Sequence, residues 1–394
     1  MSFSVIPYLD LYHNCFSPKI GGSLCDQLTN CYQQLAEYSD SEGYTKQSII
    51  KQTIFISVSG NLKYYQSKQK LLVCAKDFFD ELPPTSILAQ SPSSSSLVLE
   101  VVLVEKLQSN EILHKHNDES SWIIFQRGET KMLIAAGLCD TIEQSDILHQ
   151  SNEAFRLLNK ILTEEKMEFS DIVRQWNYIE QITKNGNFNS QHYQIFNDVR
   201  TKFYQLSEFK NGFPAATGIG IDCGGIIIDI IAVKFNNDST VISIKSPVQL
   251  DAYKYSKDLL AENNSINELS RTTPKFERAK ILNTPENKII FISGTAAISG
   301  QESTSSLSVE LQTEMTIQNM LSLISVANIE KHGIRNVEKT SFNYVRVYVK
   351  YKKDMKPVIA ICLKYFSHIP IVYVVADICR PELLVEIEAQ ASIN

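Results

Sequence analysis

The sequence predicts an α+β fold in which three related units, each an antiparallel sheet with helices on one face, form a pseudo-threefold body within one chain. A strand–helix–strand–helix–strand order runs through residues 121–236 and recurs in residues 287–394. Local motifs recur at a nearly constant offset, since Gly137 and Gly294 lie 157 residues apart and Pro214 and Pro370 lie 156 apart. Such self-similarity is typical of duplicated units.

A fainter third copy closes the N-terminal part of the chain. In each copy a proline leads into a strand, a turn and a second strand that carries an acid. The spacings are 16, 15 and 16 residues, in the pairs Pro84–Glu100, Pro214–Asp229 and Pro370–Glu386. We therefore expect a degenerate unit at 1–115, a second unit at 121–236, a polar connecting segment at 237–286 and a third unit at 287–394.

The N-terminal elements follow from periodicity and from turn residues. Apolar side chains at helical spacing predict helices, and alternating β-branched runs predict strands. Pro83 and Pro84 end the second helix. The expected elements are a helix at 23–38, a strand–turn–strand at 52–65, a helix at 71–82, and strands at 86–88 and 97–104.

The same criteria place the elements of the two later copies. In the second unit we expect strands at 121–136, a helix at 143–163, a strand at 172–182, a helix at 191–206, and strands at 217–221 and 226–235. In the third we expect a strand at 289–298, a helix at 309–326, a strand at 342–349, a helix at 356–365, and two strands within 369–388.

Composition excludes several classes of function. The chain is 43% hydrophobic and 21% charged, has a net charge of −6 and contains no basic run, which argues against nucleic acid and anionic membranes as partners. The start shows no secretory signal pattern, and no apolar stretch is long enough to span a bilayer. Eight scattered cysteines without a C-x-x-C pair indicate reduced thiols in the cytoplasm, and the seven histidines form no ligand array. We expect neither a metal nor a cofactor.

The candidate catalytic acid lies in the last predicted strand. Glu386 and Glu388 alternate with Val385 and Ile387, so the two acids share one face of the strand. Taken alone, such an acid is more often a solvated edge residue. The alternative is a partly buried carboxyl with a raised pKa, which is suited to donating a proton.

The repeated unit resembles the Rid (YjgF-type) superfamily, whose members have a chorismate mutase-like α+β fold and form small trimers with clefts between subunits. The elements that carry this resemblance are FISG at 291–294, the helix with Gln312 and Asn319, FPAAT at 213–217 and LVEIEA at 384–389. Rid deaminases hold a substrate carboxylate with an arginine two residues after the proline. That position is Ala216 in one copy and Val372 in the other, which argues against imine deamination.

From about residue 121 to the end, the chain more closely resembles the chorismatase family, whose members are similar to a Rid trimer within one chain. The matching motifs, in order, are RQWNYI at 174–179, YQIFNDVR at 193–200, FPAATGIG at 213–220, SGTA at 293–296, RVYV at 346–349 and ADICRPELLVEIE at 376–388. One departure is Gln301, where the family pattern usually has a histidine.

The resemblance implies that chorismate is the substrate. Chorismate carries two carboxylates and an enolpyruvyl ether, and its cleavage needs a proton delivered to the enol methylene by a neutral acid. The family pattern assigns this role to Glu386. A cysteine at the position of Cys379 is associated with the branch that forms 3-hydroxybenzoate, whereas the branch without it releases a dihydroxycyclohexadiene carboxylate. Ala297 leaves this hydrolase branch open.

Five further residues are candidates for binding the substrate. Tyr193 and Arg200 lie on one predicted helix and can share a face, although a solvated arginine is an equally good interpretation of Arg200. Arg346 lies between β-branched and aromatic neighbours, so it points either to an exposed face or into a cleft; we favour the cleft. Thr217 and Gly218 begin a strand that would line the same cleft.

These residues predict a cofactor-free cytoplasmic chorismatase, a monomer or weak dimer, that converts chorismate to 3-hydroxybenzoate and pyruvate. Three alternatives stay open. They are hydrolysis to the diene acid, formation of 4-hydroxybenzoate, and a non-catalytic Rid-like protein that binds a small carboxylate.

Overall fold

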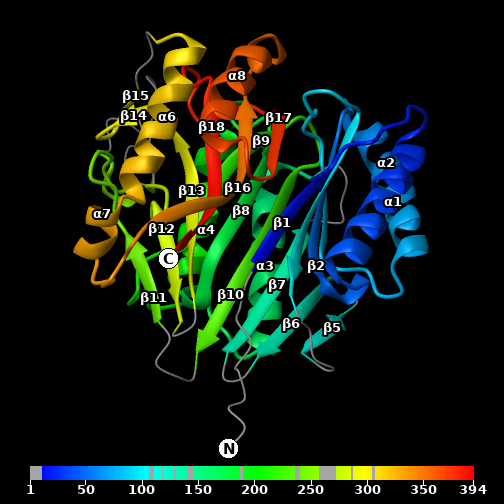
Figure 1. The fold of residues 1–394 in the computed structure, drawn as a ribbon, viewed down its shortest axis with the longest axis horizontal. Coiled ribbons are helices and arrows are strands. Elements are labelled where there is room, and N and C mark those ends of the chain that lie inside the picture. The colour runs from blue at the N-terminus through cyan, green and yellow to red at the C-terminus, as the bar shows by residue number, and fades with distance from the viewer. Residues whose placement is uncertain are drawn as a thin grey trace, which may run out of the picture.

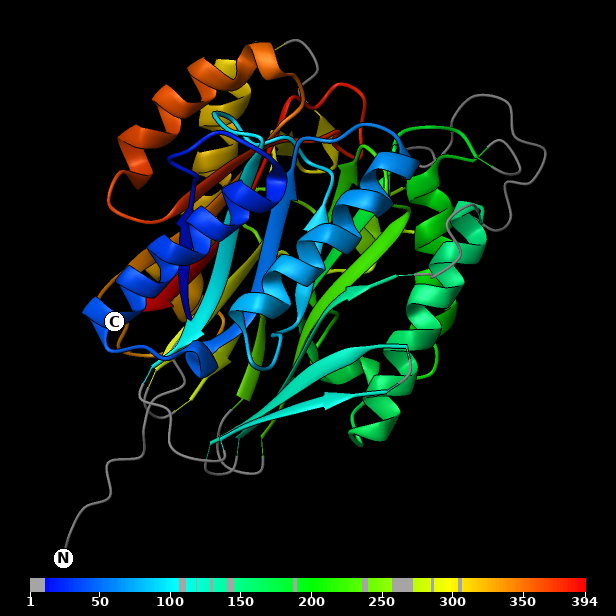
Figure 2. The same cartoon turned by 90° about the vertical axis from the view of Figure 1, so that its right-hand side faces the viewer.

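The computed structural model describes residues 11–105, 111–117, 119–127, 130–139, 145–186, 190–235, 240–256, 272–284, 287–303 and 307–394. Three sheets form the interior of the body and the long helices lie on its outside (Figures 1 and 2). The predicted α+β class is therefore confirmed.

Unit 1, residues 11–105, has a four-stranded sheet in the order β1-β4-β2-β3. Its elements are β1 (Leu11–Phe16), α1 (Leu24–Glu42), the 3-10 turn Lys46–Ser48, β2 (Ile49–Ile56), α2 (Asn61–Phe78), β3 (Thr85–Leu88) and β4 (Leu97–Val104). The expected second strand before residue 65 is wrong. Gly60, in a left-handed conformation with φ of 84°, ends the turn after β2, and α2 begins directly behind it.

Unit 2, residues 111–235, has a six-stranded sheet in the order β5-β6-β7-β10-β8-β9. Its strands are β5 (Ile112–His116), β6 (Ser121–Arg127), β7 (Thr130–Leu138), β8 (Ile172–Glu180), β9 (Ala215–Ile221) and β10 (Ile226–Phe235). Its helices are α3 (Ile147–Glu164), the 3-10 turn Phe169–Asp171 and α4 (His192–Tyr204). The turn expected around Gly128 lies outside the described residues.

Unit 3, residues 240–394, has a six-stranded sheet in the order β11-β12-β13-β18-β16-β17. Its strands are β11 (Thr240–Ile244), β12 (Ala279–Asn283), β13 (Lys288–Ala296), β16 (Thr340–Val349), β17 (Ile371–Val375) and β18 (Val385–Ile393), with a hairpin of β14 (Ile298–Ser299) and β15 (Glu302–Ser303). Its helices are α6 (Val309–Leu323), α7 (Val326–Lys331) and α8 (Met355–Phe366), with 3-10 turns at Ala252–Lys254 and Lys352–Asp354.

The three sheets share a four-strand pattern. The orders β1-β4-β2-β3, β7-β10-β8-β9 and β13-β18-β16-β17 correspond, and in each the last two strands are parallel while the other pairs are antiparallel. In every unit a long helix, α1, α3 or α6, leads to the third strand of this order, and a further helix, α2, α4 or α8, joins the two parallel strands; in unit 3 the short α7 follows α6. This topology agrees with the repeat predicted from the sequence.

Two predicted boundaries need correction. Residue 115 falls inside β5, which pairs with β6 of the second sheet. The segment 237–286 is not a simple connection, because β11 and β12 within it extend the third sheet as an antiparallel pair. Its residues 237–239, 257–271 and 285–286 lie outside the described residues. The two strands are five residues long, and Thr240, Ser243, Lys280 and Asn283 interrupt their apolar pattern.

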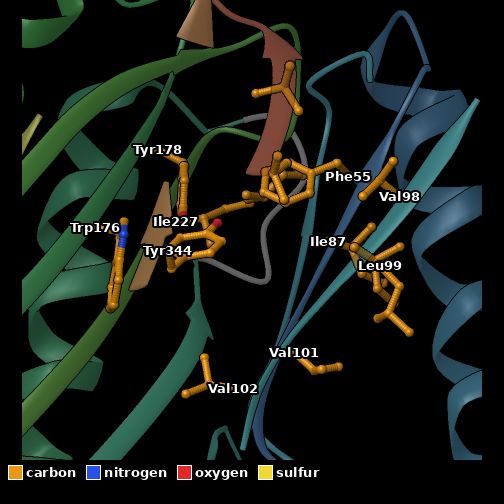
Figure 3. Close-up of a cluster of buried hydrophobic side chains, with 14 of the residues drawn as sticks. Phe55, Ile87, Val98, Leu99, Val101, Val102, Trp176, Tyr178, Ile227 and Tyr344 are labelled. Carbon is orange, nitrogen blue, oxygen red and sulfur yellow. The ribbon is translucent and has the colours of Figure 1, made fainter. Parts of the chain in front are cut away.

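One hydrophobic cluster joins all three units at the centre of the body. Figure 3 shows side chains of unit 1, among them Phe55 and Val98, together with Tyr178 and Ile227 of unit 2 and Tyr344 of unit 3. Two further clusters lie between the sheet and the helices of units 2 and 3. The central cluster fixes the three sheets against one another.

An acid on each inner sheet face forms what we call the acid ring, composed of Glu100, Asp229 and Glu388. The three residues are fully or almost fully buried. Each receives a donor from the neighbouring unit. Lys51 Nζ lies 2.9 Å from Asp229, Arg174 Nη2 lies 2.8 Å from Glu388, and the Tyr344 hydroxyl donates to Glu100.

The strand register identifies Glu388, rather than Glu386, as the counterpart of Glu100 and Asp229. In the three sheets the ring acids pair with Thr53, Trp176 and Arg346. The residues two positions earlier are Val98, Ile227 and Glu386, and each lies opposite an aromatic residue: Phe55, Tyr178 and Tyr348. The prediction that Glu386 corresponds to Glu100 and Asp229 is therefore wrong by two residues along the strand.

Candidate active site

A cavity of about 520 Å³ opens between units 2 and 3. Unit 2 contributes α4 and the start of β9, while unit 3 contributes β13, the β14–β15 hairpin and the turn before β18. Tyr193, Ala216 and Gly218 line it from unit 2, and Gly294 and Glu386 face them from unit 3.

Glu386 is a buried acid in the wall of this cavity, with only 5% of its surface exposed. Its strand pairs it with Ala296 on one side and Tyr348 on the other. Gly294 leaves the space that the carboxyl needs, because a Cβ at that position would overlap Glu386 Oε1. The interpretation of Glu386 as a solvated edge residue is thus excluded.

The electrostatic surroundings keep Glu386 protonated near neutral pH. Burial, followed by the negative charge of Glu388, raises the pKa of Glu386 to about 8, although Arg174 and Arg278 act in the opposite direction. Burial also acts on Glu388, but Arg346 and Arg174 outweigh it and lower the pKa of that carboxyl. Glu386 and Glu388, two residues apart on one face of β18, therefore differ in protonation state near neutral pH. Glu386 is protonated and Glu388 is ionised, which is the arrangement expected of a general acid beside a fixed anion.

Two arginines of unit 3 lie in the cavity wall around Tyr255. The Arg278 guanidinium carbon is 5.9 Å from the Tyr255 ring centroid and that of Arg380 is 5.2 Å from it. Arg278 Nη2 donates to the Leu250 carbonyl at 2.6 Å and to the Tyr255 hydroxyl at 2.7 Å, whereas its buried Nε has no hydrogen-bond partner. Arg278 therefore presents a positive charge in the cavity wall, and one of its buried donors lacks a partner among the described residues.

Ser293 joins the two units beside these arginines. Its hydroxyl donates to the Glu277 carbonyl at 2.6 Å and accepts from the Ala216 amide at 2.8 Å. Its own amide donates to the Arg278 carbonyl at 3.0 Å. The Ser-Gly pair at 293–294 thus fixes Arg278, β9 and the Glu386 carboxyl relative to one another. Sequence reasoning missed Arg278 because it lies in the segment that was expected to be a connection.

Cys379 also lines the cavity. Burial and the nearby Glu386 raise the pKa of its thiol to about 12. The thiol is therefore protonated at neutral pH, which suits a hydrogen-bond donor better than a nucleophile.

Sequence comparison shows similarity to the chorismatase family. Residues 108–232 match the family model described as chorismatase FkbO/Hyg5-like, N-terminal. A 3-hydroxybenzoate synthase of Streptomyces hygroscopicus is 31% identical over 57% of this chain and 64% of its own length. A chorismatase of Streptomyces rapamycinicus is 29% identical over 56% of this chain and 64% of its own length. The chain thus spans somewhat less than two thirds of the curated relatives it matches.

Fold comparison agrees over a longer span. A crystal structure of a chorismatase superposes with a TM-score of 0.68 and 19% identity, covering 97% of this chain and 98% of that chain. The chain is therefore similar to chorismatases in sequence over part of its length and in fold over nearly all of it.

The structure brings four of the residues expected from the chorismatase resemblance into the cavity: Glu386, Cys379, Tyr193 and Gly218. A side chain at Gly218 would begin 2.9 Å from the Tyr193 ring, so glycine permits their close approach. Ala216, where Rid deaminases carry an arginine, also lines the cavity. No guanidinium enters from that position.

The other four expected residues do not line the cavity. Thr217 is buried beneath it, where its hydroxyl accepts from Arg174 at 2.8 Å and from the Gly294 amide at 3.1 Å. Ala297 is fully buried, and its neighbour Ala296 lines the cavity instead. The predictions for Thr217 and Ala297 therefore gave the correct region of the chain, but neither residue lines the cavity.

The two expected carboxylate-binding arginines are buried elsewhere. Arg346 is 1% exposed and is occupied by the acid ring, at 2.6 Å from Glu100 and 3.1 Å from Glu388. Arg200 lies under the cavity wall, 2% exposed, and donates to Asn197 at 2.5 Å. The prediction that either guanidinium faces the cavity is wrong, because Arg346 is paired with acids of other strands and Arg200 with Asn197, three residues earlier on α4.

Gln301, the departure from the family pattern, connects the β14–β15 hairpin to the segment before it. Its side chain accepts from the Ser256 amide at 3.0 Å, and its carbonyl accepts from Arg380 at 2.9 Å. Gln301 therefore supports Arg380, which lines the cavity, without lining the cavity itself.

Two features of the described part of the chain bear on ligands. Among these residues no group of three or more His, Cys, Asp or Glu is arranged to hold a metal ion. No described helix is long and apolar enough to cross a membrane.

Proposed function

We propose that this protein is a chorismatase that converts chorismate to 3-hydroxybenzoate and pyruvate. The observation that carries the proposal is the pairing of a neutral carboxylic acid, Glu386, with two guanidinium groups in one cavity. The names of the relatives, 3-hydroxybenzoate synthase and chorismatase, support the same activity.

In the proposed reaction, Glu386 donates its proton to the methylene carbon of the enolpyruvyl ether. Water adds to the resulting oxocarbenium-like carbon and returns a proton to Glu386, and the bond from that carbon to the ether oxygen then breaks, so that pyruvate leaves and the ring keeps a hydroxyl. Loss of the neighbouring ring hydroxyl as water, with the proton of the adjacent ring carbon, gives the aromatic product. Arg278 and Arg380 bind the carboxylates of chorismate, and Tyr193 and Gly218 form the opposing wall. Formation of hydroxybenzoate and pyruvate consumes no net water, whereas hydrolysis to the diene acid consumes one water molecule.

The assignment of Cys379 to aromatisation rests on its place in the cavity and on the family resemblance. A protonated thiol close to Glu386 can donate a hydrogen bond to an oxygen on the ring while the ether is cleaved. Cys379→Ala should therefore shift the products from 3-hydroxybenzoate towards the diene acid. Unchanged product ratios would remove Cys379 from the reaction.

We further propose that the protein acts in the cytoplasm, without a cofactor, as a monomer or weak dimer. All eight cysteines are free thiols, which fits a reducing compartment. The three units within one chain already supply the interfaces for which a Rid trimer needs three subunits.

The proposal is tested by incubating the purified protein with chorismate, measuring pyruvate with a coupled dehydrogenase and separating the other product by chromatography. We expect equimolar pyruvate and 3-hydroxybenzoate. If the second product is the diene acid, the protein is a chorismate hydrolase; if it is 4-hydroxybenzoate, the protein forms that isomer instead of 3-hydroxybenzoate. Binding of chorismate without any pyruvate would indicate a non-catalytic carboxylate-binding protein.

A further inference from the structure

A second acid beside Glu386 is bound so tightly that it acts as a fixed charge. Glu388 accepts from Arg174 Nη2 at 2.8 Å, from the Trp176 indole at 2.8 Å and from Arg346 Nη1 at 3.1 Å. It is 2% exposed and does not line the cavity. With three donors and no solvent, this carboxylate cannot reorient or leave its place in the acid ring.

The same network also shapes the wall on which Glu386 rests. Arg174 Nη2 donates to both Glu388 and the Thr217 hydroxyl, and that hydroxyl accepts from the Gly294 amide. Gly294 is the residue whose missing side chain makes room for the Glu386 carboxyl. One arginine therefore connects the fixed anion to the glycine wall, over the interface between units 2 and 3.

We propose that Glu388 is a positioning residue that, pinned by Arg174, Trp176 and Arg346, keeps Glu386 in its proton-bearing form. The consequence of this inference for catalysis rests on the proposed function, whereas the titration that tests it does not. Glu388 touches no cavity atom, so it acts only through Glu386.

Several other charged or titratable groups face Glu386 and bound the effect. The arginines are Arg174 on β8, Arg278 directly before β12 and Arg380 in the turn before β18. The other groups are Cys379 in that same turn, Tyr193 on α4 and Tyr348 on β16. Burial is the largest cause that raises the pKa of Glu386, and the charge of Glu388 is the next, whereas Arg174 and Arg278 lower it. Glu388 is thus the anion that opposes these cations.

The test is a direct titration of the Glu386 carboxyl by infrared spectroscopy, using the difference between each protein and the same protein with Glu386→Gln. Glu388→Gln removes the anion and leaves Arg174 without an acid, so the midpoint should fall by about one pH unit or more. Arg174→Gln removes a cation while Arg346 still holds Glu388, so the midpoint should rise.

Asp229→Asn is the matched control. Asp229 is an equally buried ring acid with its own lysine, and the residue two positions before it is Ile227 rather than a cavity acid. This variant should lose stability but leave the midpoint within about 0.3 pH units. A merely structural role for Glu388 would give no shift in Glu388→Gln, and that result would overturn the proposal.

The pH profile of kcat/KM separates this inference from the proposed function. If the protein turns over chorismate, the loss of activity at alkaline pH should move to lower pH in Glu388→Gln, in step with the spectroscopic midpoint. If the midpoint shifts but no variant or parent forms pyruvate, the proposed function fails while the positioning role stands. Should Glu388→Gln not fold, Glu388→Gln combined with Arg174→Gln removes both members of the buried pair. A midpoint below that of Arg174→Gln alone would support the role, and equal midpoints would refute it.

Discussion

The interface between units 2 and 3 differs from that between units 1 and 2 at one decisive strand position. Both contain a ring acid with a cationic partner from the neighbouring unit, Asp229 in one and Glu388 in the other. Two residues earlier, β10 carries Ile227 in the central hydrophobic cluster, whereas β18 carries Glu386 in a cavity of about 520 Å³.

The comparison separates the scaffold from the chemistry. The ring acids and their partners are repeated and buried, so they serve to hold the three sheets together. The residue two positions before the ring acid can be apolar or acidic. It packs in a filled hydrophobic cluster in one interface, as Ile227, and lines an open cavity in the other, as Glu386. A pseudo-symmetric body can therefore carry one active cleft.

The largest expected effect is the loss of activity in Glu386→Gln. A positioned general acid contributes about 10²–10⁴-fold, and we expect kcat/KM to fall about 10³-fold. The side chain keeps its shape and its buried site, so the circular dichroism spectrum should not change. Glu310→Gln, at an exposed position, is the control for the same substitution outside the cavity. Activity within tenfold of the parent would remove Glu386 as the acid.

The same substitution should stabilise the protein at alkaline pH. With the pKa of Glu386 raised to about 8 from 4.5, the folded state holds a proton that the unfolded state releases. The parent therefore loses stability as the pH rises from about 4.5 through 8, by up to ~5 kcal/mol, and Glu386→Gln does not. Denaturant unfolding at pH 5 and pH 9 measures this, and an equal pH dependence in both proteins would contradict the raised pKa.

Moving the acid to the other interface should cost stability without producing activity. Ile227 is 1% exposed in the central cluster, so Ile227→Glu would bury a carboxyl that has no cavity. We expect a loss of about 3 kcal/mol in unfolding free energy. The volume-matched Ile227→Leu should lose less than about 1.5 kcal/mol. If Ile227→Glu were as stable as Ile227→Leu, the two interfaces would not differ as described.

The smallest of these effects is expected for Arg278→Gln. Loss of one charged hydrogen bond to a ligand carboxylate costs about 1.5–3 kcal/mol, so kcat/KM should fall about 10–100-fold, mainly through KM. Arg156, in an exposed pair with Glu119, provides a control substitution, Arg156→Gln, that should leave kinetics unchanged. A fall confined to kcat would assign Arg278 to the chemical step instead of binding.

The sequence predicted the repeated architecture well because it is encoded locally. Apolar periodicity and the spacing from Pro84, Pro214 and Pro370 located most helices and strands of the three units. It failed at β11 and β12, which are five residues long and mix polar residues such as Ser243 and Lys280 with apolar ones. Strands this short give little alternation to recognise.

The candidate site divides in a similar way. Alternation in β18 placed Glu386 and Glu388 on the inner face, but only the strand register distinguishes the ring acid from the cavity acid. Arg346 was misplaced because its partner, Glu100, is 246 residues distant and belongs to another unit. Charge pairing between remote strands depends on how the sheets pack, which no local pattern records.

The most direct test of the central claim is the structure of the Glu386→Gln protein with chorismate bound. We predict that the ligand occupies the cavity between units 2 and 3, with its enolpyruvyl methylene in contact with the side chain at position 386 and its carboxylates on Arg278 and Arg380. Chorismate bound in another interface, or in this cavity with its methylene directed away from position 386, would contradict the assignment of the active cleft.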